Sequence, residues 1–553
     1  MAQLSQWINT RTYTDCQADY YRQDQMMGSD TALSDPQTEK AYHRRIISWA
    51  WYDWADHAYI TTTVTTFFPP YFIAIAAASF IAVGASSSDE AAKAVARGTA
   101  SNVFALTVSF ALLVSAILAP ILGAYADITG MRKRLLIITT IPASLGSSLM
   151  FVLVTGMWQL GLGLYFVTQV ALNIALGFSS SLLPHVALRE DMNRVSSLGY
   201  AMGYVGGGLL LALNTAFYLL SDKIGIDSTL AVRIAFLSVG VWWVVFAIPL
   251  MLNVNEPPAT PLVHGSRGSA ILDSLTRLAD TLQDAARYRE MFKMLVAFWF
   301  YMEGIGAIIL LATAYGAVLG LDTGVLISTL LVTQFVAFPY TVIYGRIPVP
   351  SNRWRSVFVS MLIWTGVTFP FMGLYANLNR GVSIPLTFAM ILGNQMLGVL
   401  FSLLLGRRLF SRLVQKLDTK RVVILGLVIY TVIPIWGLFL ESEAEFFMIG
   451  WLVGTVQGGT QALSRSIYAS LIPRAKSGEF FGLYGLSEKF AGILGPFLYG
   501  IVGTLTHNPR ASIISITVFF IVGIYMLLRV NEKKGAQLAA AEEARIEVLK
   551  AAE

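Results

Sequence analysis

Cysteine, histidine and charge are all scarce in this sequence. Its 553 residues include a single cysteine and five histidines, and only 13% of them are charged. A lone cysteine excludes an internal disulfide. The histidines are scattered without metal-ligand spacing, so we expect no metal, no cofactor and no enzymatic activity. No selectivity-filter sequence or ring of charges indicates a channel.

Long polar stretches are missing between the two tails. The chain is 55% hydrophobic with a mean hydropathy of +0.62, which excludes the soluble globular class and predicts a membrane protein with many spans. The net charge of +6 requires no nucleic-acid partner, because Lys and Arg gather in alternate loops, the pattern that orients membrane helices. We expect a monomer surrounded by lipid bilayer, in a bacterial inner (plasma) membrane.

Apolar runs predict an all-α polytopic fold with both termini cytoplasmic. They number 14, which we interpret as 12 core helices plus an extra pair. The predicted divisions are a disordered cytoplasmic tail at 1–45, an N-terminal helix bundle at 46–254, a cytoplasmic linker with an amphipathic helix at 255–290, a C-terminal bundle at 291–530 and a cytoplasmic tail at 531–553. A soluble linker helix is the alternative for 255–290.

Two internal repeats are visible in the sequence. In one, Ser181-Leu-Leu-Pro184 matches Ser470-Leu-Ile-Pro473. At the same offset, Gly203 and Gly206 match Gly492 and Gly495. It predicts two matching halves with a substrate site between them. In the weaker repeat, Gln334 precedes Gly345-Arg346 by the same spacing as Gln395 precedes Gly406-Arg407. It predicts an extra helix pair near 324–377, unless two unrelated helix ends share Gly-Arg by chance.

The first apolar run contains ionisable side chains. Asp53, Asp56 and His57 share one helical face, and Thr61 and Thr65 continue it. A charge at the centre of a membrane helix costs roughly 2.5 to 3.5 kcal/mol on insertion scales, so this face must contact protein or a water-filled cavity. These three groups are candidates for substrate or proton binding, the alternative for the acids being a structural ion pair.

Other polar side chains lie within the apolar runs, Arg465 near the cytoplasmic end of its run. Arg465 suits a carboxylate, although snorkelling or a pair with Glu479 is the alternative. Gln169, Asn173 and Tyr204 either line the cavity or bridge helices. The full set of predicted substrate- or proton-binding residues is Tyr52, Asp53, Asp56, His57, Gln169, Asn173, Tyr204, Glu303, Gln457, Gln461 and Arg465.

The loop after the second run reads GAYADITGMRKRLL. Its glycines allow close approach and a tight turn, its acid can receive a neighbouring helix N-terminus, and its cations hold it at the cytoplasmic surface. The pattern resembles the loop signature of the major facilitator superfamily, which implies two bundles rocking about a central cavity. The gating residues so implied are Gly123, Asp127, Gly130, Arg132 and Lys133. The counterpart from Gly406 to Arg421 has no acid at the matching place.

Three further stretches narrow the resemblance: YDWADHAY, WFYMEGIGA from Trp299, and the segment from Gln461 to Pro496. They resemble the branch called "unknown major facilitator", related to vacuolar amino-acid effluxers associated with autophagy. The branch usually has Asn at Asp56, a small residue at His57 and Asp near Glu303. The resemblance implies a secondary transporter for an amino acid or similar small solute. Proton coupling is a hypothesis motivated by Asp53, Asp56, His57 and Glu303. Sugar or drug transport is the alternative, and a non-transporting scaffold or receptor is a third.

Overall fold

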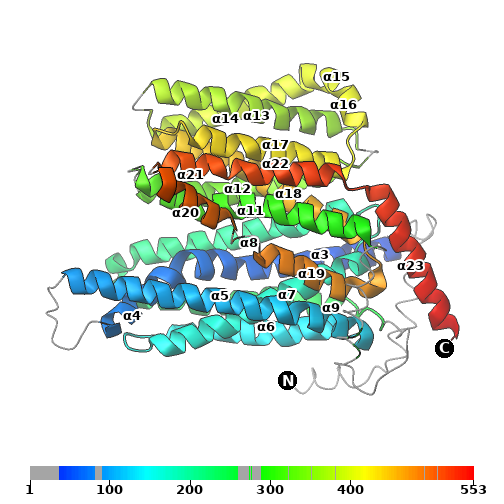
Figure 1. Cartoon of the computed structure of the whole chain (residues 1–553), viewed down its shortest axis with the longest axis horizontal. Coiled ribbons are helices and arrows are strands. Elements are labelled where there is room, and N and C mark those ends of the chain that lie inside the picture. Colours follow the sequence, from blue (N-terminus) through cyan, green and yellow to red (C-terminus); the bar gives the residue numbers. More distant parts are fainter. Residues whose placement is uncertain are drawn as a thin grey trace.

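Two helix bundles form the protein, one from each half of the chain (Figure 1). The computed structural model describes residues 36–80, 90–259, 273, 276, 288–319, 321, 323–349, 352–379, 382–490, 492, 494–506 and 508–552, and every regular element among them is helical. The all-α fold is therefore as predicted. Most of the segment 255–290, in which an amphipathic helix is predicted, lies outside the described residues.

The first half begins with a helix that changes its winding. Its elements are α3 (Pro36–Ala58), the π-helix η2 (Tyr59–Phe67), α4 (Phe68–Phe80), α5 (Glu90–Thr129), α6 (Arg132–Leu149), α7 (Trp158–Val186), α8 (Met192–Leu220) and α9 (Ser228–Asn253). α3 begins at Pro36, so the boundary predicted at residue 46 is wrong. The reason is packing, because the buried Tyr42 donates a hydrogen bond to Asp191 Oδ2 over 2.9 Å.

The second half holds more elements. They are α11 (Arg289–Val318), α12 (Thr323–Arg346), α13 (Arg355–Leu378), α14 (Ile384–Phe401), the π-helix η5 (Ser402–Gly406), α15 (Arg407–Leu409), α16 (Ser411–Gln415), α17 (Thr419–Gly437), α18 (Glu443–Ser470), the 3₁₀ turn η6 (Arg474–Lys476), α19 (Ser477–Phe490), α20 (Leu494–Thr506), α21 (Pro509–Ser515), α22 (Thr517–Leu528) and α23 (Glu532–Ala552). The two halves meet mainly where α8 packs on α12 and α5 packs on α19.

Membrane-spanning character is clear for most of these helices. Within the described residues, 11 helices are long and apolar enough to cross a bilayer. α18 is not among them, although it has 28 residues, and it is buried along nearly its whole length from Ala444 to Ala469. A helix surrounded by protein has no need of an apolar surface, which explains its Gln, Ser and Thr content. The predicted count of 14 spans stays a prediction.

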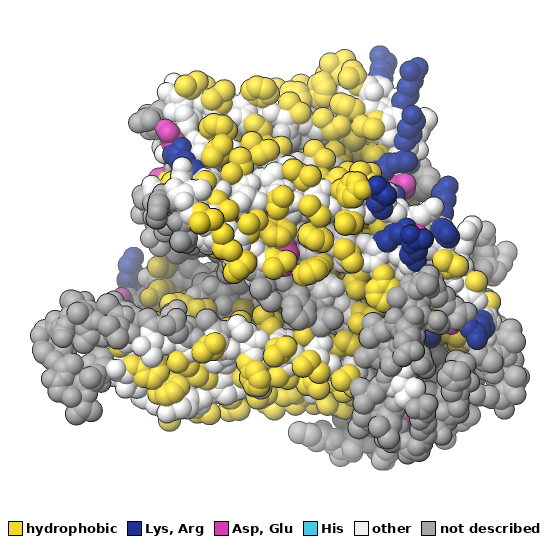
Figure 2. Space-filling view, in the orientation of Figure 1, with side chains coloured by type: hydrophobic (Ala, Val, Ile, Leu, Met, Phe, Trp, Pro, Cys, Tyr) yellow, Lys and Arg dark blue, Asp and Glu magenta, His cyan; other side chains and the backbone are white. Residues whose placement is uncertain are grey.

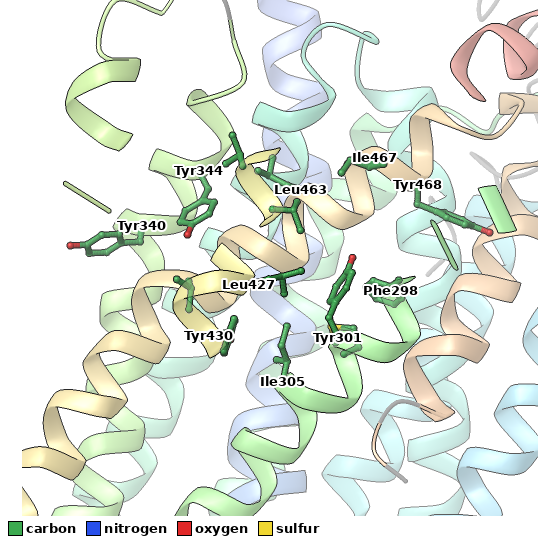
Figure 3. Close-up of a cluster of buried hydrophobic side chains, with 14 of the residues drawn as sticks. Phe298, Tyr301, Ile305, Tyr340, Tyr344, Leu427, Tyr430, Leu463, Ile467 and Tyr468 are labelled. Atoms are coloured by element: carbon green, nitrogen blue, oxygen red, sulfur yellow. The ribbon is translucent and has the colours of Figure 1, made fainter. Parts of the chain in front are cut away.

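The core of the second half packs around α18. Figure 3 shows Leu463, Ile467 and Tyr468 of α18 facing Phe298 and Tyr301 of α11. Tyr301 is fully buried and donates a hydrogen bond of 2.6 Å to Ser464 Oγ. Apolar packing and this hydrogen bond therefore fix the rotation of α18, the helix that carries Arg465.

Lys and Arg gather at one end of the bundle, at the right in Figure 2. We call it the basic end. It is where α6, α8, α11, α17 and α19 begin and where α22 ends. The asymmetry of Lys and Arg between loops predicts that this end is cytoplasmic.

The structure reveals a repeat at the basic end that sequence reasoning did not find. Lys133 donates from its backbone N to Glu256 Oε1 and from Nζ to the Val254 carbonyl, both over 2.7 Å. Lys420 makes the same pair of contacts, to Glu532 Oε1 over 2.9 Å and to the Val530 carbonyl over 2.6 Å. The start of α17 therefore matches the start of α6.

This match bears on the predicted extra helix pair. If α17 is the counterpart of α6, then α13 and α14 are the pair without a counterpart, and they lie on the outer side of the second bundle (Figure 1). The range predicted for the extra pair, 324–377, includes α12, which packs centrally against both α18 and α8. The match therefore favours α13 and α14 as the extra pair, whose existence stays a prediction.

The apolar run near 480–504 predicts one helix, but two helices, α19 and α20, occupy that range, so this prediction is wrong. α20 carries Pro496 in its first turn, where the missing N–H has no intrahelical partner to lose. The N–H of Gly495 instead reaches Glu303 Oε2 over 2.9 Å. A side chain of α11 thus satisfies the start of α20.

Candidate functional site

A buried ion pair joins the two halves of the protein. Asp53 of α3 and Arg465 of α18 are 2% and 4% exposed, and Arg465 Nη2 lies 3.2 Å from Asp53 Oδ2. Sequence reasoning raised a pair with Glu479 as an alternative for Arg465, but the guanidinium turns to the opposite half. Two predicted site residues therefore meet across the boundary between bundles.

The guanidinium of Arg465 is enclosed by polar and aromatic groups. It donates from Nε to Ser196 Oγ over 3.0 Å and from Nη2 to the Ser196 carbonyl over 2.9 Å. Its Cζ lies 4.9 Å from the ring centroid of Trp49 and 4.3 Å from that of Tyr200. The faces of aromatic rings attract a cation, and this attraction is strongest when water is excluded. The setting therefore keeps the guanidinium charged and oriented.

Glycines on α8 let α3 approach closely enough for this contact. A Cβ at Gly199 would collide with the Asp53 carboxylate, and one at Gly203 would lie 2.7 Å from the His57 ring. These positions therefore accept only glycine with the present packing. Gly203 belongs to the repeat seen in the sequence, whereas Gly199 carried no signal of its own.

Asp56 and His57 form a second buried polar group on α3. His57 Nδ1 and Asp56 Oδ1 are 2.7 Å apart, and the carboxylate is fully buried. The other oxygen, Oδ2, has no hydrogen-bond partner among the described residues. The His57 ring meets Tyr200 and Tyr204 edge-on, with centroids 6.1 and 5.9 Å apart.

The backbone changes winding directly after His57. The π-helix η2 begins at Tyr59, so the single face predicted to run from Asp53 through Thr65 does not continue with α-helical spacing. Thr61 turns towards α8, where its Oγ1 donates to the Gly207 carbonyl over 3.1 Å. π-Helical turns are rare and often mark functional positions, because they move side chains off the regular register.

Further polar contacts surround the pair on α8 and α18. Tyr204 donates to Gln461 Oε1 over 2.8 Å, which joins two more predicted site residues across the boundary between halves. Gln457 is almost buried one turn before Gln461. The α18 face with Gln457, Gln461 and Arg465 therefore looks onto the first bundle.

Glu303, a predicted site residue, lies in the second half. It is fully buried on α11, and its contact to Gly495 sets it at the start of α20. A carboxylate at a helix N-terminus is favoured by the backbone dipoles. Its predicted role in proton or substrate binding is consistent with a broken helix, which is a recurrent feature of transporter sites.

Three predicted residues lie within the first bundle. Tyr52 hydrogen-bonds Thr140 over 2.8 Å, and Asn173 Nδ2 donates to Ser115 Oγ over 3.4 Å. Gln169 is almost buried, and its Oε1 has no hydrogen-bond partner among the described residues. Tyr52 and Asn173 therefore bridge helices of one half, as the alternative interpretation had it for Asn173.

The loop motif joins the halves at the basic end. Asp127, at the end of α5, accepts hydrogen bonds of 2.9 Å from the backbone N–H groups of Gly478 and Glu479 in the first turn of α19. It also pairs with Arg132 Nε over 2.6 Å, and both side chains are fully buried. The acid receives a helix N-terminus, as its position in the motif suggested.

The remaining motif residues fit α5 and α6 around this contact. Arg132 donates from Nη2 to the Ala475 carbonyl of the second half over 2.8 Å. Gly123 faces Gly478 so closely that a Cβ would collide with the Gly478 carbonyl, and Gly130 turns the chain with φ of +63°. The basic end is therefore closed in this structure.

Glu256 supports the same corner from outside the membrane-spanning segments. Its carboxylate accepts from the backbone N–H groups of Lys133 and Arg134 at the start of α6, over 2.7 and 3.0 Å. Burial raises the pKa of Glu256 above its ordinary value, and these hydrogen bonds oppose the rise.

Sequence reasoning missed part of the site. Ser196, Tyr200 and Trp49 enclose the guanidinium, yet none is ionisable at neutral pH, and single serines and aromatics are common in membrane helices. The available signal was spacing, because Trp49 lies one turn before Asp53 and Ser196 one turn before Tyr200.

Comparison with protein families gives one description over most of the chain. The family model described as "Vacuole effluxer Atg22 like" matches residues 41–388 and 382–540. An uncharacterized MFS-type transporter of Bacillus subtilis, YxiO, is 26% identical over 502 residues, which is 90% of this chain and 98% of that protein. Autophagy-related protein 22-1 of Aspergillus clavatus is 25% identical over 369 residues, 63% of this chain. The chain spans about half the length of such fungal relatives, 51% in this case.

Solved structures support the same fold. The fucose:proton symporter FucP of E. coli matches with a TM-score of 0.56 and 13% identity, over 89% of this chain and 98% of that one. The proton:xylose symporter XylE matches with a TM-score of 0.55 and 13% identity, over 91% and 99%. At such identity the likeness shows the fold alone.

Proposed function

Because the chain belongs to the Atg22-like vacuole effluxer family and is a membrane transporter of the major facilitator type, we propose that it carries zwitterionic α-amino acids by alternating access. The observation that carries the proposal is the buried pair between Asp53 and Arg465. Autophagy-related names among the relatives fit an effluxer, and the family description supports export.

The pair is a poor device for stability alone. Taking two charges out of water costs several kcal/mol per ion, and apolar replacements of buried pairs are often neutral or stabilising. Such a pair is better explained if each of its two charges can exchange its partner for a charged group of the substrate. An α-amino acid carries one carboxylate and one ammonium, the same two charges that the protein holds together here.

We infer that substrate and ion pair replace each other. When the halves separate, the substrate carboxylate takes the planar guanidinium of Arg465, which binds carboxylates in a two-pronged manner. The substrate ammonium takes Asp53, and Tyr200 and Trp49 keep the arginine in place. Each charge therefore has a partner in the empty and in the loaded protein, which lowers the cost of moving between them.

Proton coupling is assigned to the neighbouring group. Asp56 and His57 share a hydrogen bond beside Asp53, and imidazole is the side chain that ordinarily titrates near neutral pH. Protonation would change the charge next to the substrate ammonium and so link proton and substrate binding. Glu303, at the start of α20, is a second proton site in this proposal.

Counterflow in proteoliposomes tests the substrate claim. Purified protein is reconstituted with unlabelled amino acid inside, and uptake of labelled L-amino acid is followed. Asp53→Asn and Arg465→Lys each disturb the pair, and we expect uptake to fall on the order of 100-fold, as for loss of one buried partner. Asp227→Asn, an exposed cap of α9, is the matched control. Unchanged uptake in both site variants would refute the substrate claim.

Proton coupling has a separate readout. Counterflow needs no proton gradient, so Asp56→Asn, His57→Gln and Glu303→Gln should preserve it while abolishing accumulation driven by a pH gradient. If pH-driven accumulation persists in all three variants, coupling through these groups is excluded. A sugar has no charge to exchange with the Asp53 pair, so labelled sugars serve as the competing substrate class.

We also propose a location and an assembly. The bacterial relative is matched over nearly its full length, which supports the plasma membrane of a bacterium. One chain supplies both halves of the site, so a monomer suffices for transport.

A further inference from the structure

A groove of about 400 Å³ opens on the outside of the second bundle at the basic end. It lies between α11 and α22, and none of its lining residues takes part in the transport proposal. Its lining consists of Arg289, Phe292, Lys293, Val296, Met526 and Arg529.

The lining is layered along the membrane normal. On α11 the four lining residues recur at helical spacing, with Arg289 at the helix start and Val296 about 10 Å deeper at 1.5 Å rise per residue. On α22, Met526 lies deeper and Arg529 follows the helix end. Cations therefore occupy the interface and apolar side chains the membrane below them.

Positive charge exceeds negative charge in the groove. Glu290 is nearly buried and pairs with Lys293 Nζ over 2.8 Å. Among the described residues no carboxylate pairs with Arg289 or Arg529, and both are exposed. Arg529 is instead held by Tyr525, to whose hydroxyl Nη2 donates over 2.5 Å. Two arginines thus face the same space, and no carboxylate of the described residues is paired with either of them.

We propose that this groove binds an anionic phospholipid, with the phosphate between Arg289 and Arg529 and an acyl chain along Val296 and Met526. A soluble anion would use the cations but not the apolar floor, and a zwitterionic lipid would gain little from uncompensated charge. Basic pockets between helices at a membrane surface are suited to anionic headgroups, each nearby cation contributing about 1 kcal/mol.

Lipid titration followed by native mass spectrometry tests the proposal. Phosphatidylglycerol and phosphatidylcholine are titrated separately into the detergent-solubilised full chain, and retained lipid is counted. We expect preferential retention of phosphatidylglycerol. The double variant Arg289→Gln/Arg529→Gln should bind it on the order of 25-fold more weakly, about five-fold per cation removed.

The matched control removes the same charge from the same end. Arg407→Gln/Arg408→Gln changes two exposed arginines of α15, outside the groove, and should leave retention unchanged. Equal retention of both lipids, or equal loss in both double variants, would overturn the proposal. Inorganic phosphate is the third arm, and full displacement of phosphatidylglycerol by millimolar phosphate would assign the groove to a free anion instead. A thermal melt of each variant confirms that it is folded.

Discussion

Replacing Asp127 with Asn should open the basic end. Asp127 is the acid through which the first half holds the start of α19, and its two hydrogen bonds to Gly478 and Glu479 exist only when the halves are together. Its pair with Arg132 lies within the first half and survives opening. The substitution therefore weakens the closed state more than the open one.

The size of the effect follows from the helix terminus. A carboxylate at a partly buried helix N-terminus contributes up to about 2 kcal/mol, and the amide keeps one acceptor but loses the charge. A shift of about 2 kcal/mol changes the equilibrium constant for opening about 30-fold. Gly123→Ala should act in the same direction, since its Cβ would meet the Gly478 carbonyl.

Pulsed electron–electron double resonance, which measures the distance between two spin labels, reports the opening directly. Spin labels on Glu190→Cys and Arg412→Cys report the distance between exposed sites of the two halves at the basic end, in a Cys16→Ser background without other cysteines. Asp127→Asn should add a population at longer distance, and the exposed Asp222→Asn should not. Identical distance distributions in Asp127→Asn and the unmodified protein would refute the gating role of this contact.

Three further outcomes are expected. Gly199→Ala should abolish amino-acid counterflow, because its Cβ would collide with the Asp53 carboxylate, whereas Gly163→Ala, which meets no atom within 4 Å, should not. Burial raises the pKa of Glu532 from 4.5 to about 7. The stabilisation by its protonated form is therefore fully present below pH 4.5 and is lost as pH rises through 7. Thermal melts of Glu532→Gln should show a smaller loss of stability over that range than melts of the unmodified protein. Glu542→Gln removes the ion pair to Lys476 of the turn η6. Amide hydrogen exchange in η6 should become faster by up to about five-fold, with no change expected in α9.

The sequence predicted well those features that depend on the membrane itself. Apolar runs gave the all-helical fold, because a segment in lipid must satisfy its own backbone. The same constraint singled out Asp53 and Arg465, since a charge at that depth must find protein or water. The loop motif led to Asp127 and a helix N-terminus, which the structure places together.

Features that depend on rotation and contact between helices were not predictable. Spacing puts Asp53, Asp56 and His57 on one face, but only packing turns Asp53 towards Arg465 and leaves Asp56 with His57. The π-helix after Ala58 has no signature in apolar periodicity. Likewise, nothing local distinguishes Pro496 in a continuous helix from Pro496 in the first turn of α20.

Repeats were only partly recognised for a similar reason. The sequence Val-Asn-Glu occurs at 254–256 and again at 530–532, and Lys-Arg occurs at 133–134 and 420–421, but two-residue and three-residue matches carry little weight alone. The structure gives them weight, because in both halves the Lys contacts the same two partners. α23 shows the opposite case. The segment predicted only as a tail, 531–553, contains this helix, in which Ala539 and Ile546 are buried and Glu542 reaches Lys476 of η6.

The central claim is that a zwitterion exchanges with the pair of Asp53 and Arg465. The most direct test is counterflow of three labelled compounds in proteoliposomes: a neutral amino acid, its carboxamide and its deaminated acid. The account predicts exchange of the amino acid alone, because the amide leaves Arg465 without a carboxylate and the acid leaves Asp53 without an ammonium. Equal exchange of either analogue, or of an uncharged sugar, would contradict it.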